Sequence, residues 1–363
     1  MLTNEQSKNL RERVTGTGDG GYHLIAGPGG SRAILATSGM LMALEFFEIR
    51  NFKSIGGISG GSIPLRLFAA GLSIKQIVDT ALELSFESML DRESSIADVI
   101  ATHYRAGRYR GSVPSKGVFK TDRMGAWLES FSSRWPAGYW TLAVKDDHQV
   151  LLAGSGVHMR ARGGRFRCIS ASAPPLGLAI QASCSVPGFF APVDIPLDNG
   201  ETMNLCDGGV SWEGFRPTSV VEEFFSAKPG EIIVCDVGPE PDYYSRLVNS
   251  AWRIVCGGRC VPPRGKNTEA ENEMVVVSPV VASVTSFDFA AHSDKKWQAI
   301  IEGFAATTRA LNKAYRLTEE QYAHAKDTVD TFYRFVDVFK NAPQGELSEH
   351  TRALLNHRGV LLS

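Results

Sequence analysis

The sequence predicts an α/β fold with a mainly parallel or mixed sheet. Apolar segments typical of strands lie near residues 23, 54, 140, 150, 166, 204, 232 and 274, and segments with helical periodicity alternate with them in the first and last thirds of the chain. Residues 232–235 are continuously apolar, as in a strand buried on both faces. Two strand-like segments around a polar turn at 145–148 indicate a hairpin, which adds antiparallel pairing.

The composition is that of an ordinary globular protein. Of the 363 residues 43% are hydrophobic, and 38 basic and 39 acidic side chains leave a formal charge of −1. This balance provides no global field that would attract nucleic acid. The N-terminal segment is polar, and no run reaches the roughly eighteen apolar residues of a membrane span. These features favour the cytoplasm, with export by a signal-less route left open, and they carry no signal for an oligomeric state.

We expect one catalytic domain. Residues 1–21 are a flexible lead, residues 22–316 the catalytic domain, and residues 317–363 a helical extension with aromatic residues at helical spacing. The six cysteines lie mostly in apolar surroundings, which is typical of reduced buried thiols. Cys256 and Cys260 have a spacing that suits metal ligands, but no second Cys or His pair lies near them in the sequence. We therefore expect neither a metal nor another cofactor.

Ser59 is the predicted nucleophile. It lies in Gly57-Ile58-Ser59-Gly60-Gly61, which fits the G-x-S-x-G pattern of a nucleophile elbow. A short strand ends near Ile55, and residues 62–70 follow the motif as a helix that ends at Gly71. A strand, a sharp turn and a helix are the context in which this motif presents a serine to substrate. Directly after this helix, Ser73 and Gln76 have the spacing of a capping box, which opens a further helix through about Leu90.

A second glycine-rich turn precedes the elbow. The strand at 23–26 runs into Gly27-Pro28-Gly29-Gly30-Ser31-Arg32, and a helix follows over residues 33–49. Free N–H groups at such a helix start suit an anion, either a phosphate or the oxyanion of an acyl-transfer intermediate. The residues do not match the usual nucleotide-binding loops, so a phosphate is the less favoured of these two anions. A tight turn without a ligand is the other interpretation.

Two further segments are candidates for substrate contact. Residues 103–120 carry five basic and three aromatic side chains and no acidic one, and they include Arg105, Arg108 and Arg110. This loop is either a lid that meets anionic headgroups or a solvated connection. An apolar turn at 186–193 holds Phe189 and Phe190 between two prolines.

In this order along the chain, the motifs resemble those of the patatin-like phospholipase family. The resemblance covers about residues 22–312. It rests on Pro28-Gly29-Gly30-Ser31-Arg32, on the elbow at 57–61, on Ala182-Ser183-Cys184-Ser185-Val186-Pro187 with Phe190-Ala191-Pro192-Val193, and on Asp207-Gly208-Gly209. It implies a three-layer α/β/α fold with a central, mostly parallel or mixed sheet.

The resemblance also implies a Ser–Asp dyad without a histidine. Ser59 would attack an ester carbonyl, Asp207 would pass the proton to the leaving alcohol, and water would hydrolyse the acyl-enzyme. Backbone N–H groups of Gly29, Gly30 and Ser31, with that of Gly60, would form the oxyanion hole. A free Asp has a pKa of about 3.9 and is a weak base at neutral pH, so such a dyad needs close geometry and strong stabilisation of the developing charge.

The implied substrate is a phospholipid or a related lipid ester, and peripheral contact with a membrane surface follows from it. The residues predicted to contact the substrate are Arg32, Arg105, Arg108, Arg110, Phe189 and Phe190.

Alternative functions remain at this stage. Pro28 and Ala33 stand where the family usually has glycine, Gln181 where it has arginine, and residues 211–217 where it has asparagine and proline after Asp-Gly-Gly. These departures leave open a weakly active or non-catalytic binding protein of the same fold. Ser59, Asp207 and His292 also stand in the chain order of a Ser-His-Asp α/β-hydrolase, and an acyltransferase would use the same elbow.

Overall fold

The computed structural model describes residues 21–105, 116–214, 216–238, 273–314, 316–341 and 349. Ten strands of the described chain form one sheet. They are β1 (Tyr22–Ala26), β2 (Phe52–Gly57), β5 (Tyr139–Lys145), β6 (His148–Ala153), β7 (Gly156–Arg160), β8 (Arg167–Ser170), β9 (Val193–Pro196), β10 (Thr202–Asp207), β11 (Ile232–Cys235) and β12 (Val275–Val277). Their order is β12-β11-β1-β2-β5-β6-β7-β8, with β10 paired to β5 and β9 to β10. The eight predicted strands are all present, and the predicted mixed sheet is confirmed.

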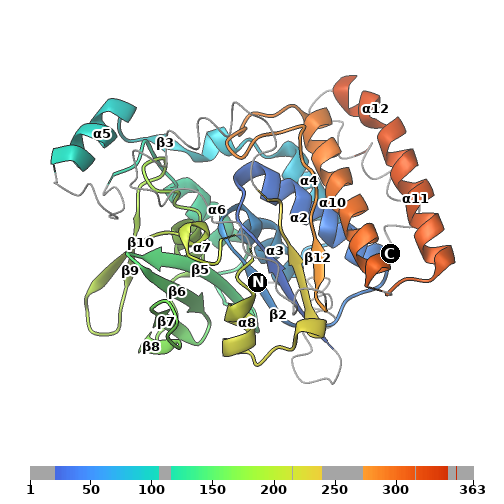
Figure 1. Ribbon diagram of the computed structural model, residues 1–363. Helices are drawn as coiled ribbons and strands as arrows, with labels where there is room; N and C mark the ends of the chain where they lie inside the picture. The colour runs from blue at the N-terminus through green and yellow to red at the C-terminus, as the bar shows by residue number, and fades with distance from the viewer. Residues whose placement is uncertain are drawn as a thin grey trace.

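Helices cover both faces of this sheet (Figure 1). They are α2 (Gly30–Phe46), α3 (Ser62–Ala69), α4 (Ile74–Glu83), α5 (Ile96–Arg105), α6 (Asp122–Phe131), α7 (Leu176–Ser183), α8 (Thr218–Phe224), α10 (Ser293–Lys313), α11 (Glu319–Arg334) and α12 (Val336–Asn341). Along β1, Leu24 and Ala26 belong to the core shared with α2, α4 and α10. Ile25, between them, belongs to the opposite core with Val220 and Val221 of α8. This alternation along one strand gives the three layers of an α/β/α fold.

The sheet has a parallel half and an antiparallel half. Strands β12, β11, β1, β2 and β5 are mutually parallel, and α2 provides the crossover from β1 to its neighbour β2. Strands β5 to β8 form an antiparallel meander, which begins with the predicted hairpin and pairs Ala143 with Val150. The hairpin turn has Asp146 in the left-handed conformation, with φ 52°.

Two strands share one edge of β5. β6 occupies the other edge along the whole strand. β2 runs parallel to β5 and ends with Gly57 opposite Thr141, whereas β10 runs antiparallel and ends with Asp207 opposite Ala143. The carboxyl ends of β2 and β10 therefore meet head to head beside β5. The elbow follows one of these ends, and the Asp-Gly-Gly turn follows the other.

Several local predictions are confirmed. Gly71 follows α3 with φ 85°, as expected for a glycine that ends a helix. Ser73 and Gln76 form the predicted capping box at the start of α4. The end of α4 differs, however: the helix stops at Glu83 rather than near residue 90, because Leu84 takes the extended angles φ −65° and ψ 119°.

The C-terminal helices belong to the main hydrophobic core. Phe332 of α11 packs against Trp297 and Phe304 of α10, with ring centroids 5.5 and 5.6 Å apart. In Figure 1, α11 and α12 lie at the outer side of α10. Within the described ranges, no helix combines the length and the apolar character that a membrane span needs.

Candidate active site

Ser59 lies at a strained turn between β2 and α3. The turn is a short 3-10 helix over Ser59–Gly61, and Ser59 has φ 53°, a left-handed conformation that non-glycine residues rarely adopt. A Cβ at Gly57 would lie 2.3 Å from the Cα of Ser62, so the chain can fold back this tightly only with glycine at that position. Ser59 is 4% exposed.

The elbow packs directly on the glycine-rich turn that opens α2. The N–H of Ile58 donates to the Ala26 carbonyl at 3.0 Å. A Cβ at Gly60 would lie 2.2 Å from the Gly30 carbonyl oxygen, so the two turns are in backbone contact. Gly30 is the first residue of α2, and Gly60 lies in the first turn of the 3-10 helix. N–H groups at such positions have no intrahelical acceptor, which suits them to an oxyanion.

Ser31 does not join these donors in this structure. Its N–H donates to the carbonyl of Ser286 at 2.9 Å. A Cβ at Gly30 would lie 2.0 Å from this same carbonyl oxygen. The segment around Ser286 thus covers this part of the glycine-rich turn and takes the donor that the sequence assigned to the oxyanion hole.

Asp207 ends β10 and is held by a turn of its own. Its N–H donates to the Ser185 carbonyl at 2.9 Å, and its Oδ1 accepts the N–H of Gly209 at 2.7 Å. Its Oδ2 is buried and has no hydrogen-bond partner among the described residues. A Cβ at Gly208 would lie 2.1 Å from the Leu142 carbonyl oxygen, so the turn lies against β5.

The environment of Asp207 changes its acidity. Burial raises the pKa of Asp207 from 3.8 to about 7, against the smaller lowering effects of the Ser59 hydroxyl and the Gly209 N–H. The Ser59 hydroxyl is thus near the carboxyl, although Oδ2 accepts no hydrogen bond of standard length and angle. Loose contacts of this kind are common before substrate binds. A carboxylate with a pKa near 7 is a far better base than the free side chain considered from sequence alone.

The residues that depart from the usual family pattern have defined contacts. Pro28 packs against the Asp207 turn, because a Cβ at Gly209 would lie 2.5 Å from the Cβ of Pro28. The amide of Gln181 donates to Asp122 at 2.8 Å.

The segment after Gly209 is anchored by a polar network. Gln149 donates to Ser211 at 3.2 Å, and Arg160 forms ion pairs with Glu213 and Glu223 at 3.3 and 2.6 Å. These contacts hold the altered tail of the Asp207 turn against β6 and β7.

Arg32 has a structural role in place of the predicted substrate contact. Its guanidinium is buried and donates to the backbone carbonyls of Val281, Gly238 and Val237, at 3.3, 3.2 and 2.7 Å. These bonds tie the start of α2 to residues that follow β11 and β12 in the chain. The guanidinium is therefore directed into the protein and away from any headgroup.

Phe189 and Phe190 belong to a cluster of five phenylalanines. The other members are Phe119, Phe287 and Phe289. Phe189 is central to it, with ring centroids 4.6 Å from Phe287 and 5.4 Å from Phe119. Because Phe287 follows Ser286 directly, this apolar cluster lies next to the segment that covers the glycine-rich turn.

The remaining predicted contacts are outside what the structure describes. Arg108, Arg110 and the Cys256–Cys260 pair lie outside the described residues, and Arg105 is described only as the last backbone position of α5. Their predicted roles stay predictions.

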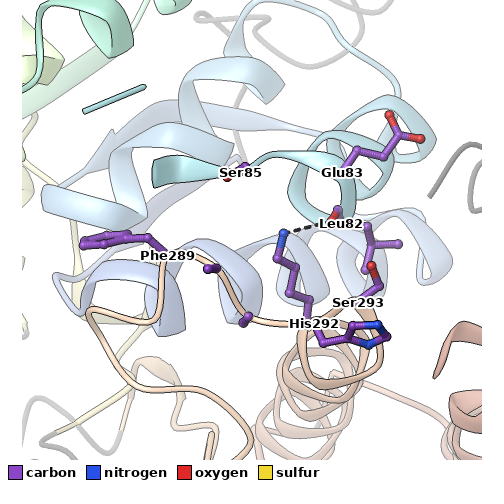
Figure 2. A pocket seen from close by; sticks show the side chains of 9 residues that line it. Leu82, Glu83, Ser85, Phe289, His292 and Ser293 are labelled. Carbon is purple, nitrogen blue, oxygen red and sulfur yellow. Dashed lines mark hydrogen bonds between the residues drawn. The ribbon is translucent and has the colours of Figure 1, made fainter. Parts of the chain in front are cut away.

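His292 is the N-cap residue of α10. Its Nδ1 is 2.6 Å from Oδ1 of Asp294, and its side chain is 60% exposed. Figure 2 shows His292 among the residues that line a pocket, together with Leu82, Glu83 and Phe289. The volume of this pocket is about 270 Å³. In this pocket the buried amine of Lys296 donates to the carbonyls of Leu82 and Leu84 at the end of α4, at 2.9 and 2.8 Å. Lys296 thus caps the last turn of α4. Neither Ser59 nor Asp207 lines this pocket.

The fold and this site define a class of protein: a three-layer α/β/α protein with a serine elbow, a glycine-rich turn and an aspartate turn at one edge of a central strand. Residues 25–213, just over half of the chain, match the family model of the patatin-like phospholipases, and the chain belongs to this family. The matched range includes the glycine-rich turn, Ser59 and Asp207. Membership supports a lipid ester hydrolase function.

The individual proteins to which this chain is similar share 27% or less of their aligned residues with it. The uncharacterized protein YqhO of Bacillus subtilis (strain 168) is 27% identical over 187 residues, which cover 50% of this chain and 61% of YqhO. VipD from Legionella pneumophila has a TM-score of 0.45 and 13% identity, over 93% of this chain and 79% of the VipD chain. Human GIVD cytosolic phospholipase A2 has a TM-score of 0.38 and 12% identity, over 98% of this chain and 68% of that chain.

Proposed function

We propose that this protein is a serine acyl hydrolase that cleaves fatty-acyl esters of phospholipids or related lipids through a Ser59–Asp207 dyad. The observation that carries the proposal is the position of the two residues: Ser59 lies in the turn directly after β2, and Asp207 lies at the end of β10, beside the same edge of β5. A strained, buried serine next to a carboxylate with a pKa of about 7 has the properties of a nucleophile with its base.

The first half-reaction forms an acyl-enzyme. The Ser59 oxygen attacks the ester carbonyl, and its proton moves to Oδ2 of Asp207, the carboxyl oxygen without a partner among the described residues. The N–H groups of Gly29, Gly30 and Gly60 stabilise the negative charge on the former carbonyl oxygen. Each such donor contributes roughly 2.7–4 kcal/mol in serine hydrolases. Asp207 then gives the proton to the leaving alcohol as the C–O bond breaks.

The second half-reaction releases the acid. Water attacks the acyl carbonyl and gives a proton to Asp207, and Asp207 passes this proton to the Ser59 oxygen as the acyl–oxygen bond breaks, which restores both residues. The phenylalanine cluster around Phe189 and Phe190 supports an acyl chain as the group that is transferred, because its rings offer apolar contact area close to the segment at Ser286.

A fatty-acid release assay on a mixed panel of phospholipids, lysophospholipids and neutral glycerides tests this function. Wild type is expected to release fatty acid, Ser59→Ala none above background, and Asp207→Asn at most about a hundredth of the wild-type rate. Asp194→Asn is the matched control, since Asp194 is exposed on β9 and bonds Asn204 at 2.9 Å. Covalent labelling by a fluorophosphonate is expected in wild type and absent in Ser59→Ala. A folded wild type that neither labels nor releases fatty acid would instead support the non-catalytic alternative.

A further inference from the structure

The turn at the end of α7 contacts the backbone of both dyad residues. The N–H of Ser59 donates to Oγ of Ser183 at 3.1 Å, and the Ser183 hydroxyl donates to the Leu142 carbonyl of β5 at 2.6 Å. Two residues further along, the Ser185 carbonyl accepts the N–H of Asp207. Sequence reasoning used this segment as a family motif but assigned it no role.

The carbonyl of Ser59 is also held by a hydroxyl. Ser62 donates from Oγ to the Ser59 carbonyl at 2.5 Å, and the same Oγ lies 3.6 Å from Sγ of Cys184. Both backbone groups of the nucleophile are therefore fixed by side chains that belong to the turn or contact it. A left-handed serine persists only where its surroundings determine its conformation in this way.

We propose that Ser183 is a positioning residue for the nucleophile: its hydroxyl holds the amide of Ser59 and thereby keeps Ser59 in the left-handed conformation of the elbow. The proposal rests on the proposed function of Ser59 and Asp207. Ser183 is fully buried and bonds one donor and one acceptor. Removal of its hydroxyl leaves the Ser59 N–H and the Leu142 carbonyl without their partner. The amide regains a partner only if the elbow peptide rotates, and that rotation moves the nucleophile.

A second buried serine provides a matched control. Ser38, in the middle of α2, is also fully buried, and its hydroxyl donates to the Ile34 carbonyl of its own helix at 2.9 Å. Ser183→Ala and Ser38→Ala thus remove the same atom from equally buried positions. Only the first removes a contact with Ser59.

The first measurement is amide hydrogen exchange of the peptide that contains Ser59. Exchange at this peptide is expected to be roughly tenfold faster or more in Ser183→Ala, as for one lost buried hydrogen bond, and unchanged in Ser38→Ala. Ser183→Cys, which keeps a weak donor and acceptor, is expected to lie between them and serves if the alanine variant does not fold. The proposal would be overturned if the Ser59 amide were equally protected in wild type and in Ser183→Ala. If only Ser183→Cys folds, the same comparison is made between wild type and that variant.

The second measurement is the rate of fluorophosphonate labelling together with kcat and KM for a soluble ester. Ser183→Ala is expected to lose roughly ten- to hundredfold in kcat and in labelling rate, with KM and the melting temperature close to those of Ser38→Ala. A loss confined to KM, or matched by Ser38→Ala, contradicts positioning. If wild type is not labelled at all, the proposed function fails, while the exchange comparison still decides whether Ser183 holds Ser59.

Discussion

Gly209 anchors one oxygen of Asp207 and not the other: its N–H donates to Oδ1 at 2.7 Å, while Oδ2 is buried without a partner in the described part of the chain. This asymmetry suits the general-base role that we propose for Asp207. The anchored oxygen fixes the orientation of the carboxyl group, and burial keeps its pKa near 7 instead of near 4.

Activity should therefore rise with pH through neutrality. Only the ionised form of Asp207 can accept the Ser59 proton, and burial raises its pKa to about 7. We expect kcat/KM for a soluble ester to fall about tenfold for each pH unit below this value and to level off above it, as for a single ionisation. A pH–rate profile of the free enzyme provides the check. A midpoint near that of an exposed carboxylic acid would exclude Asp207 as the base in this environment.

The same residue should limit stability at neutral pH. Because its pKa is higher in the folded state than in the unfolded chain, its contribution to stability is fully present below about pH 4 and is lost as the pH rises to about 7. Asp207→Asn has no such ionisation. The melting temperature of Asp207→Asn minus that of wild type should therefore increase as the pH rises over this range. The substitution should also lower kcat roughly 10²- to 10⁴-fold, as on loss of a general base. Thermal melts of both proteins across this range test the expectation, and a constant difference would contradict it.

Contact between the two glycine-rich turns should be essential for turnover. Gly60→Ala places a Cβ 2.2 Å from the Gly30 carbonyl oxygen, so the elbow and the start of α2 must separate. We expect a loss of roughly 10²-fold or more in kcat, comparable with loss of an oxyanion donor. Gly230→Ala is the control, because a Cβ at Gly230 meets no atom within 4 Å. Equal activity of the two variants would show that the contact is dispensable.

Replacement of His292 should leave turnover intact. Its side chain is largely exposed and bonds Asp294 at the start of α10, so it occupies the position of a helix-capping residue. We expect His292→Ala to keep kcat within about twofold of wild type, as for surface substitutions, with a small loss of stability at most. Steady-state kinetics on the same ester decide the point, and complete loss of turnover would restore a Ser-His-Asp triad as the mechanism.

The sequence was sufficient for the elements that carry local signals. The strands that hold long apolar runs, the capping box at Ser73, and the glycine that ends α3 were all predictable from residue type and spacing. β7 and β9 were not predicted. β7 contains His158 and Arg160, and β9 is four residues long and ends at Pro196, so neither has a continuous apolar pattern.

The properties of the candidate site depend on contacts that no local pattern contains. Asp207 is identifiable as a motif residue, but its pKa depends on burial by segments far away in the chain. Arg32 is chemically suited to a headgroup, and only the tertiary fold reveals the three carbonyls that it binds. The N–H of Ser31 is likewise engaged by Ser286, which is 255 positions further along the sequence.

The shared edge of β5 has a consequence for how activity is lost. Ser59 follows the end of β2, Asp207 is the last residue of β10, and both strands are hydrogen-bonded to β5. The Thr141 hydroxyl of β5 also donates to the Gly57 carbonyl at 2.7 Å. Fraying of surface segments leaves these backbone bonds in place, because central strands open only with the whole domain. On heating or in denaturant, ester hydrolysis should therefore disappear in the same cooperative transition as the secondary structure, with no earlier inactivation step.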